Sequence, residues 1–112
     1  MAELPVIGIT IGDAAGIGPE ITIKAIVDER VTSVCRPLVI GNADFLRRTA
    51  ESFSLPGPVD LHDLKNLPDE VIPGSSTAET GKAAGECIES AVDLWRSGHI
   101  DAICTAPISK HS

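Results

Sequence analysis

Aromatic side chains are scarce in this 112-residue chain, which has two phenylalanines, one tryptophan and no tyrosine. Its hydrophobic core must therefore be built from Ile, Val, Leu and Ala. Hydrophobic residues nevertheless make up 43% of the chain and charged residues 22%, values that fit a folded globular domain and argue against disorder. The length suits one small domain.

Positive charge is also in short supply, because nine Lys and Arg residues face 16 Asp and Glu residues, which gives a net charge of −7. An acidic protein repels the phosphodiester backbone, so nucleic acid is excluded as the expected partner. An anionic ligand would have to be held locally, by backbone N–H groups or by a single placed lysine.

Cysteine is rare, and Cys35, Cys87 and Cys104 are odd in number and far apart. This spacing favours reduced thiols over a disulfide framework and offers no CxxC zinc pair. No apolar run approaches the length of a membrane span, and the first residues lack the basic and apolar regions of a signal peptide. We expect a cytoplasmic protein.

Short β-branched runs alternate with helical patterns along the chain. The predicted strands cover residues 5–11, 37–41, 59–62 and 100–104, and the predicted helices cover residues 19–28, 43–53 and about 76–98. This alternation predicts an α/β fold with a mainly parallel sheet and flanking helices. The first and last strands do not alternate with polar residues, so both are predicted to be fully buried.

The sequence predicts how the helices are capped and which of their residues are buried. Asn42 or Asp44 would cap the second helix. Ser76 and Glu79 have the spacing of a capping box at the start of the third helix. On its apolar face Trp95 is predicted to lie in the core. Cys87 and Cys104 would pack as small hydrophobic residues, whereas Asp28, Glu29, Asp69 and Glu70 are interpreted as solvated charges.

Two polar loops follow predicted strands, at residues 12–18 and 105–110. In parallel sheets ligands bind outside the carboxyl ends of the strands, so these loops could face one site. The first loop fails the dinucleotide fingerprint because Ile21 occupies the third glycine position, and it lacks the lysine of a Walker A loop. A ligand-binding loop and a tight turn that needs glycine only for its backbone angles both remain open.

Single residues in these loops have two interpretations each. Asp13 would orient a ligand hydroxyl or ammonium, or bond its own backbone as a turn residue. Lys110 would neutralise a phosphate or carboxylate, or remain solvated. Thr105 would hydrogen-bond a ligand or end the strand.

Taken together, the two loops resemble a known family. The segment GDAAGIGPEITIKAI (residues 12–26) resembles the GDPAGIGPEI signature of the 4-hydroxythreonine-4-phosphate dehydrogenase (PdxA) family, and TAPISK (residues 105–110) resembles its TAPINK segment. PLVIGN (residues 37–42) also lies where a similar segment lies in the family. The resemblance covers essentially the whole chain.

The resemblance implies a fold like that of isocitrate and isopropylmalate dehydrogenases, with two α/β domains, a cleft and a homodimer. It implies NAD-dependent oxidation of 4-phosphooxy-L-threonine, or of D-threonate or D-erythronate 4-phosphate, followed by decarboxylation. The divalent metal (Zn, Mg or Co) would sit on three histidines, some from the partner subunit, and would polarise the substrate and stabilise the enolate. Asp13, Gly16, Gly18, Thr105 and Lys110 would line the substrate cleft.

The chain departs from the family at two points. Ala14 replaces the usual proline of the first motif, and the expected GHTE-like segment and metal histidines do not follow Ser112. His62, His99 and His111 lack ligand spacing and match none of those histidines, so no metal role is carried onto them. We therefore expect residues 1–112 to form a single partial α/β domain of a longer enzyme, inactive alone.

Two alternatives remain open. One is a stand-alone, non-catalytic α/β module that binds a small anion or a partner chain. The other is an acyl-phosphate transferase of the same broad fold group, which would not be expected to show both loops.

Overall fold

A computed structural model describes residues 3–58, 60–68, 71–72, 74–75 and 77–107. Its elements follow the predicted alternation of strands and helices. They are β1 (Val6–Thr10), α1 (Gly18–Ile26), α2 (Glu29–Thr32), β2 (Arg36–Gly41), α3 (Ala43–Ser52), β3 (Leu61–Asp63), α4 (Ala78–Arg96) and β4 (Ala102–Thr105).

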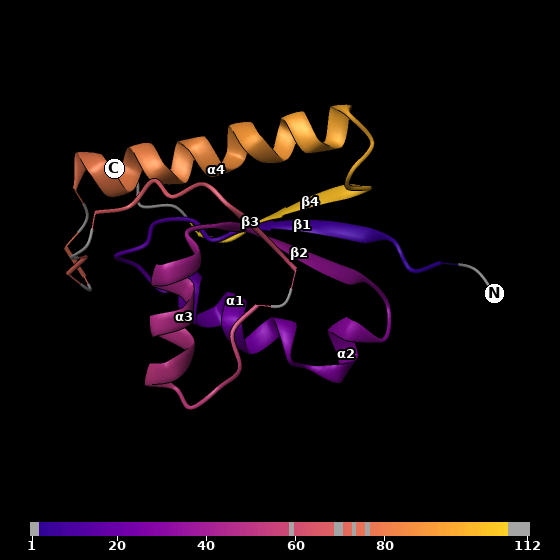
Figure 1. The fold of residues 1–112 in the computed structure, drawn as a ribbon, viewed down its shortest axis with the longest axis horizontal. Helices are drawn as coiled ribbons and strands as arrows, with labels where there is room; N and C mark the ends of the chain where they lie inside the picture. Colours follow the sequence, from indigo (N-terminus) through magenta and orange to yellow (C-terminus); the bar gives the residue numbers. More distant parts are fainter. Residues whose placement is uncertain (1–2, 59, 69–70, 73, 76, 108–112) are drawn as a thin grey trace.

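The four strands form one sheet in the order β3-β2-β1-β4, and every neighbouring pair is parallel. The predicted α/β class is confirmed. Helix α4 covers one face of the sheet, and α1, α2 and α3 lie on the opposite face (Figure 1). Because all strands run in one direction, their carboxyl ends meet at a single edge.

The core lies between the sheet and the helices on both faces. As predicted from the shortage of aromatic residues, its fully buried members are aliphatic apart from one thiol: Ile11, Ile23, Val39, Ile40, Leu46, Ala50, Cys87 and Ala91. Burial of Cys87 confirms its interpretation as a small hydrophobic residue.

Helix ends follow local capping chemistry. Asn42 caps α3, where its side chain accepts a hydrogen bond from the amide of Phe45 at 3.0 Å. The predicted capping box of α4 is wrong by one position, because Thr77 is the N-cap: its hydroxyl oxygen accepts a hydrogen bond from the Thr80 amide, and the Thr80 hydroxyl oxygen accepts one from the Thr77 amide. Glu79 is a first-turn acid beside the box, and Ser76 lies outside the described residues.

One short helix was not predicted. In α2 the carboxylate of Asp28 accepts a hydrogen bond from the amide of Arg30 and pairs with its guanidinium at 2.7 Å. Asp28, predicted to be a solvated charge, is at the surface and also caps α2. Four residues carry too little periodicity for a sequence pattern to indicate a helix.

Burial of β4 and of Trp95 differs from expectation. The last strand, β4, is exposed at all four of its residues, so its predicted burial is wrong, as is the predicted packing of Cys104. Trp95 on α4 is 54% exposed and not a core residue. In the described part of the chain β4 has only β1 as a sheet neighbour, which leaves its outer edge unpaired.

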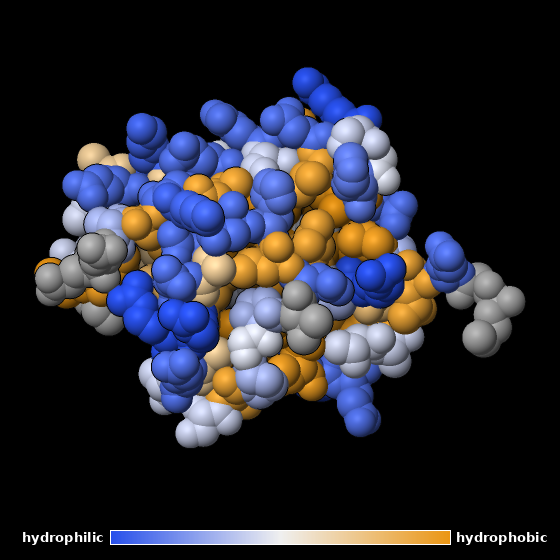
Figure 2. Space-filling model, viewed as in Figure 1, coloured by the Kyte–Doolittle hydropathy of each residue, from blue (hydrophilic) through white to orange (hydrophobic). Residues whose placement is uncertain are grey.

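Figure 2 shows charged and polar side chains along α4, with apolar residues gathered in a band between that helix and the lower part of the molecule. No helix among the described residues is both long and apolar enough to cross a bilayer.

Candidate functional site

The loops that follow β1 and β4 meet at the carboxyl edge of the sheet. The amide of Ala106 donates to the carbonyl oxygen of Thr10 at 2.9 Å, and the amide of Asp13 donates to that of Pro107 at 3.3 Å. The prediction that the loops share one edge is therefore confirmed for residues up to Pro107.

Two glycines leave room for close backbone contacts here, Gly12 between the two loops and Gly18 within the first. Gly12 has a φ of +72°, and a Cβ added there would lie 2.1 Å from the carbonyl oxygen of Pro107. A Cβ on Gly18 would lie 1.9 Å from the carbonyl oxygen of Ile11. Both positions exclude any side chain, because real Cβ atoms do not approach backbone atoms so closely. The glycines thus have a structural role, whether or not the loop also binds a ligand.

Asp13 is 1% exposed and organises the first loop. Its Oδ1 accepts a hydrogen bond from the amide of Ala15 at 2.8 Å, and its carbonyl oxygen accepts one from the amide of Gly16 at 2.9 Å. This is the turn interpretation of Asp13, realised in the structure. A role in holding substrate remains a prediction.

Thr105 ends β4, directly opposite Thr10 of β1 in the sheet register. Thr105 is exposed, whereas Thr10 is 0% exposed and its hydroxyl has no hydrogen-bond partner among the described residues. The sequence analysis missed Thr10, although a hydroxyl at the end of an apolar strand was a signal that could have identified it.

The structure therefore gathers four of the five predicted cleft residues, Asp13, Gly16, Gly18 and Thr105, near the carboxyl edge of β1 and β4. Lys110, the fifth, lies outside the described residues. Whether these residues contact substrate stays a prediction.

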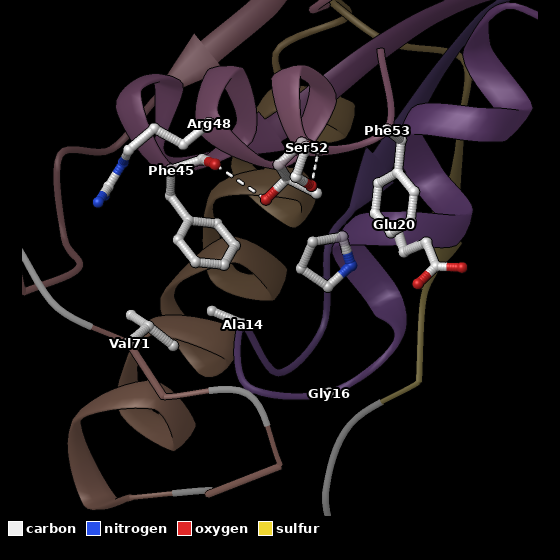
Figure 3. Close-up of a pocket in the computed structure, with 10 residues that line it drawn as sticks. Ala14, Gly16, Glu20, Phe45, Arg48, Ser52, Phe53 and Val71 are labelled. Atoms are coloured by element: carbon white, nitrogen blue, oxygen red, sulfur yellow. Dashed lines mark hydrogen bonds between the residues drawn. The ribbon is translucent and has the colours of Figure 1, made fainter. Parts of the chain in front are cut away.

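A groove of about 410 Å³ opens between the first loop and α3. Figure 3 shows Phe45 and Ser52 projecting from α3, with Phe53 following, toward the loop that carries Ala14 and Gly16. The groove is lined by Ala14, Gly16, Pro19, Glu20, Phe45, Arg48, Thr49, Ser52, Phe53 and Val71. Sequence reasoning assigned no function to the α3 residues.

The acidic side chain that lines the groove, Glu20, is paired with a lysine outside the lining. Glu20, in the first turn of α1, forms an ion pair of 2.8 Å with Lys24 one turn later. The ammonium of Lys24 in turn lies 4.9 Å from the centre of the Phe53 ring, a cation–π distance. Arg48 brings a guanidinium to the rim (Figure 3).

A metal centre does not fit the described residues. Among them, no group of three or more His, Cys, Asp or Glu side chains is arranged to hold a metal ion. His62 lies in β3 and His99 follows α4, and His111 lies outside the described residues. No residue of the chain is assigned to NAD.

Comparison with known proteins is specific. The sequence profile of the family described as "Pyridoxal phosphate biosynthetic protein PdxA" matches residues 33–112. The D-threonate 4-phosphate dehydrogenase of Cupriavidus necator is 41% identical over 97% of this chain, and a putative D-threonate 4-phosphate dehydrogenase of Oceanobacillus iheyensis is 35% identical over all of it.

Solved structures agree. The 4-hydroxythreonine-4-phosphate dehydrogenase of Burkholderia phymatum superposes with a TM-score of 0.92 at 41% identity over 98% of this chain. The enzyme of that name from Klebsiella pneumoniae gives 0.85 at 31% identity over 97%. The chain spans only 38% of the length of either structure, and 38% and 39% of the two sequence relatives.

Proposed function

Because the chain belongs to the PdxA family, we propose that it is part of an NAD-dependent dehydrogenase acting on a four-carbon phosphorylated hydroxy acid. The substrate is 4-phosphooxy-L-threonine or the 4-phosphate of D-threonate or D-erythronate. The names of the relatives support this class, since they specify 4-hydroxythreonine-4-phosphate and D-threonate 4-phosphate.

The observation that carries the proposal is the meeting of two family-like loops at one sheet edge. GDAAGIGPE and the start of TAPISK are joined by the hydrogen bond from Asp13 to Pro107. Asp13, Gly16, Gly18, Thr105 and Lys110 would together form one wall of the substrate cleft. Lys110 would screen the anionic substrate, and Asp13 would hold the loop or a cleft lysine.

In this proposal residues 1–112 form a single partial domain of a cytoplasmic homodimer. A divalent metal and NAD would supply Lewis-acid and hydride-accepting chemistry. The described residues do not fit the metal, so no step through it is assigned to this chain. The isolated 112 residues are expected not to reduce NAD with any of these three substrates.

A chimera tests the proposal. Residues 1–112 would replace the matching segment of the Cupriavidus necator dehydrogenase, and NAD reduction would be followed with each phosphorylated acid. We expect the kcat/KM of the chimera to lie within about tenfold of that of the parent enzyme. This ratio corresponds to a difference of at most about 1.4 kcal/mol in transition-state stabilisation. Comparing the substrates identifies which acid this segment favours.

The control is the parent enzyme carrying the same junctions with its own segment. A chimera that is folded and dimeric yet inactive with every substrate would overturn the proposal and favour a non-catalytic module. Turnover by the isolated 112-residue chain at an enzyme-like rate would contradict the expected inactivity of the fragment.

A further inference from the structure

We propose that Thr10 is a positioning residue. Its buried hydroxyl donates a hydrogen bond to the hydroxyl oxygen of Thr105 and so aims the Thr105 proton at an anionic oxygen of the substrate. This inference rests on the proposed function, in which Thr105 lines the substrate cleft, and adds a residue to which the cleft wall gives no role. Its basis is the place of the two threonines in the sheet and the burial of the Thr10 hydroxyl.

The hydroxyl of Thr10 is an exception in this structure. Thr10 is 0% exposed, and its oxygen is the one buried side-chain nitrogen or oxygen atom among the described residues that has no hydrogen-bond partner. Most buried polar atoms are hydrogen-bonded, because an unbonded one costs free energy. A valine would fill the same space without this cost, so packing does not explain the hydroxyl.

The register of the sheet identifies the partner. Thr10 is paired with Ile40 of β2 on one side and with Thr105 of β4 on the other. Paired residues lie side by side on the same face of a sheet, on strands about 4.8 Å apart. Ile40 has no polar side-chain atom, and the space over Gly8, two residues earlier on that face, is filled by Ile40 and Ile100. Thr105 is therefore the register neighbour that can bond to the Thr10 hydroxyl.

The Thr105 side chain can make this bond without any change of the backbone. Thr105 is exposed, so rotation about its χ1 angle displaces no core residue. Threonines on neighbouring strands form such hydrogen bonds between their hydroxyls. The amide of Ala106 donates to the Thr10 carbonyl oxygen at 2.9 Å and thereby holds the ends of β1 and β4 together. Only the two hydroxyls need to reorient.

The charge of the proposed substrate sets the direction of the bonds. Its carboxylate and phosphate oxygens are acceptors, so Thr105 has to donate its single proton to them. The oxygen of Thr105 then accepts a hydrogen bond, and the O–H of Thr10 is the donor beside it. Two such bonds in series polarise each other and become stronger. Thr10 thus holds Thr105 in its donating orientation, which reduces the ordering that binding requires.

The chimera with the Cupriavidus necator dehydrogenase tests the pair, with turnover and binding measured separately. Binding is measured without NAD, as the rise in thermal midpoint caused by each of the three phosphorylated acids. Thr10→Val should lower kcat/KM about threefold to tenfold, mainly through a higher KM, because one hydrogen bond is lost. Thr10→Ser keeps a hydroxyl and should restore most of this loss. Thr22→Val is the matched control, since Thr22 is a buried threonine on α1, and should change neither quantity.

A double-mutant cycle distinguishes a coupled pair from two independent residues. In a chimera that already carries Thr105→Val, Thr10→Val should have little further effect, because the hydroxyl that it orients is gone. Stability gives a second measurement. In the 112-residue chain without ligand, Thr10→Val should leave the urea midpoint unchanged or raise it, since no hydrogen bond to a described residue is lost.

Failure of the pair and failure of the proposed function give different results. An active chimera that Thr10→Val does not impair would overturn the pair and leave the proposed function standing. Additive effects of the two substitutions, or a lower urea midpoint in Thr10→Val, would also overturn the pair. A chimera that binds an acid without oxidising it would overturn the proposed function, and weaker binding by Thr10→Val would still support the pair. Absence of binding to all three acids would overturn both.

Discussion

The amide nitrogen of Asp13 lies 3.3 Å from the carbonyl oxygen of Pro107, to which it donates a hydrogen bond. The two residues are 94 positions apart in the chain, yet this contact joins the loop after β1 to the loop after β4. The close approach depends on Gly12, whose missing side chain leaves room for the Pro107 carbonyl.

Gly12→Ala should therefore separate the loops or destabilise the fold. Alanine at a φ of +72° is strained, and its Cβ would lie 2.1 Å from the Pro107 oxygen. We expect a loss of at least about 2 kcal/mol in the free energy of unfolding, measured by urea denaturation.

Gly85→Ala is the matched control, because Gly85 lies within α4 and a Cβ there meets nothing within 4 Å. Alanine should raise helix stability by about 0.5–1 kcal/mol. Equal effects of the two substitutions would contradict the steric role of Gly12.

Asp13 can be tested for turn and cleft roles separately. Asp13→Ala removes the acceptor of the Ala15 amide, and Ala15 is 4% exposed, so unfolding free energy should fall by about 1–3 kcal/mol. Asp13→Asn keeps an oxygen acceptor and should cost less. If the carboxylate serves the cleft, the asparagine chimera should lose kcat/KM while remaining stable. Wild-type activity in that stable chimera would leave only the turn role.

Asp28 should titrate at unusually low pH. The Arg30 guanidinium, hydrogen-bonded to it, lowers the pKa of the Asp28 carboxyl from 3.8 to about 2. A lowered pKa in the folded state means that the pairing stabilises the protein above about pH 4 and is lost as pH falls toward 2. The chemical shift of the Asp28 side-chain carboxyl carbon, followed by NMR as a function of pH, would measure this pKa. A midpoint near 3.8 in the wild-type protein would contradict it. Arg30→Gln should raise the pKa toward 3.8 without reaching it, because the backbone amide of residue 30 still donates to the Asp28 carboxylate.

The cysteines should differ sharply in reactivity. Burial raises the pKa of the Cys87 thiol to about 11, and Cys87 is 2% exposed, whereas Cys104 is exposed. Because the thiolate is the nucleophile, an aromatic disulfide reagent at pH 8 should modify Cys104 in the folded protein and reach Cys87 only after unfolding. Mass spectrometry of the peptides would measure the extent of modification of each cysteine. Modification of both at equal rates would show that the helix opens readily.

The exposed edge of β4 should promote association between copies. Unpaired edge strands offer backbone hydrogen bonds to other strands, and Ile103 on β4 is 36% exposed. We expect concentration-dependent sedimentation, with Ile103→Lys raising the dissociation constant at least about tenfold. Val34→Lys, at an exposed position between α2 and β2, should change little. A stable monomer at all concentrations would refute this expectation.

The sequence alone predicted the α/β class, because β-branched runs and helical periodicity reflect which residues can be buried locally. It also predicted that the two loops share an edge, since parallel strands place their carboxyl ends together. It did not predict the exposure of Trp95 or β4. An apolar pattern shows that a residue can be buried, but not whether a neighbouring element covers it.

The groove on α3 was likewise beyond sequence reasoning. Phe45 and Leu46 belong to one apolar stripe, yet only the packing of α1 and the first loop against α3 decides that Leu46 enters the core and Phe45 faces a cavity. The family signature, glycine positions and strand order follow from local chemistry along the chain. Which apolar surfaces stay open depends on contacts between distant segments, and those exist only in the folded molecule.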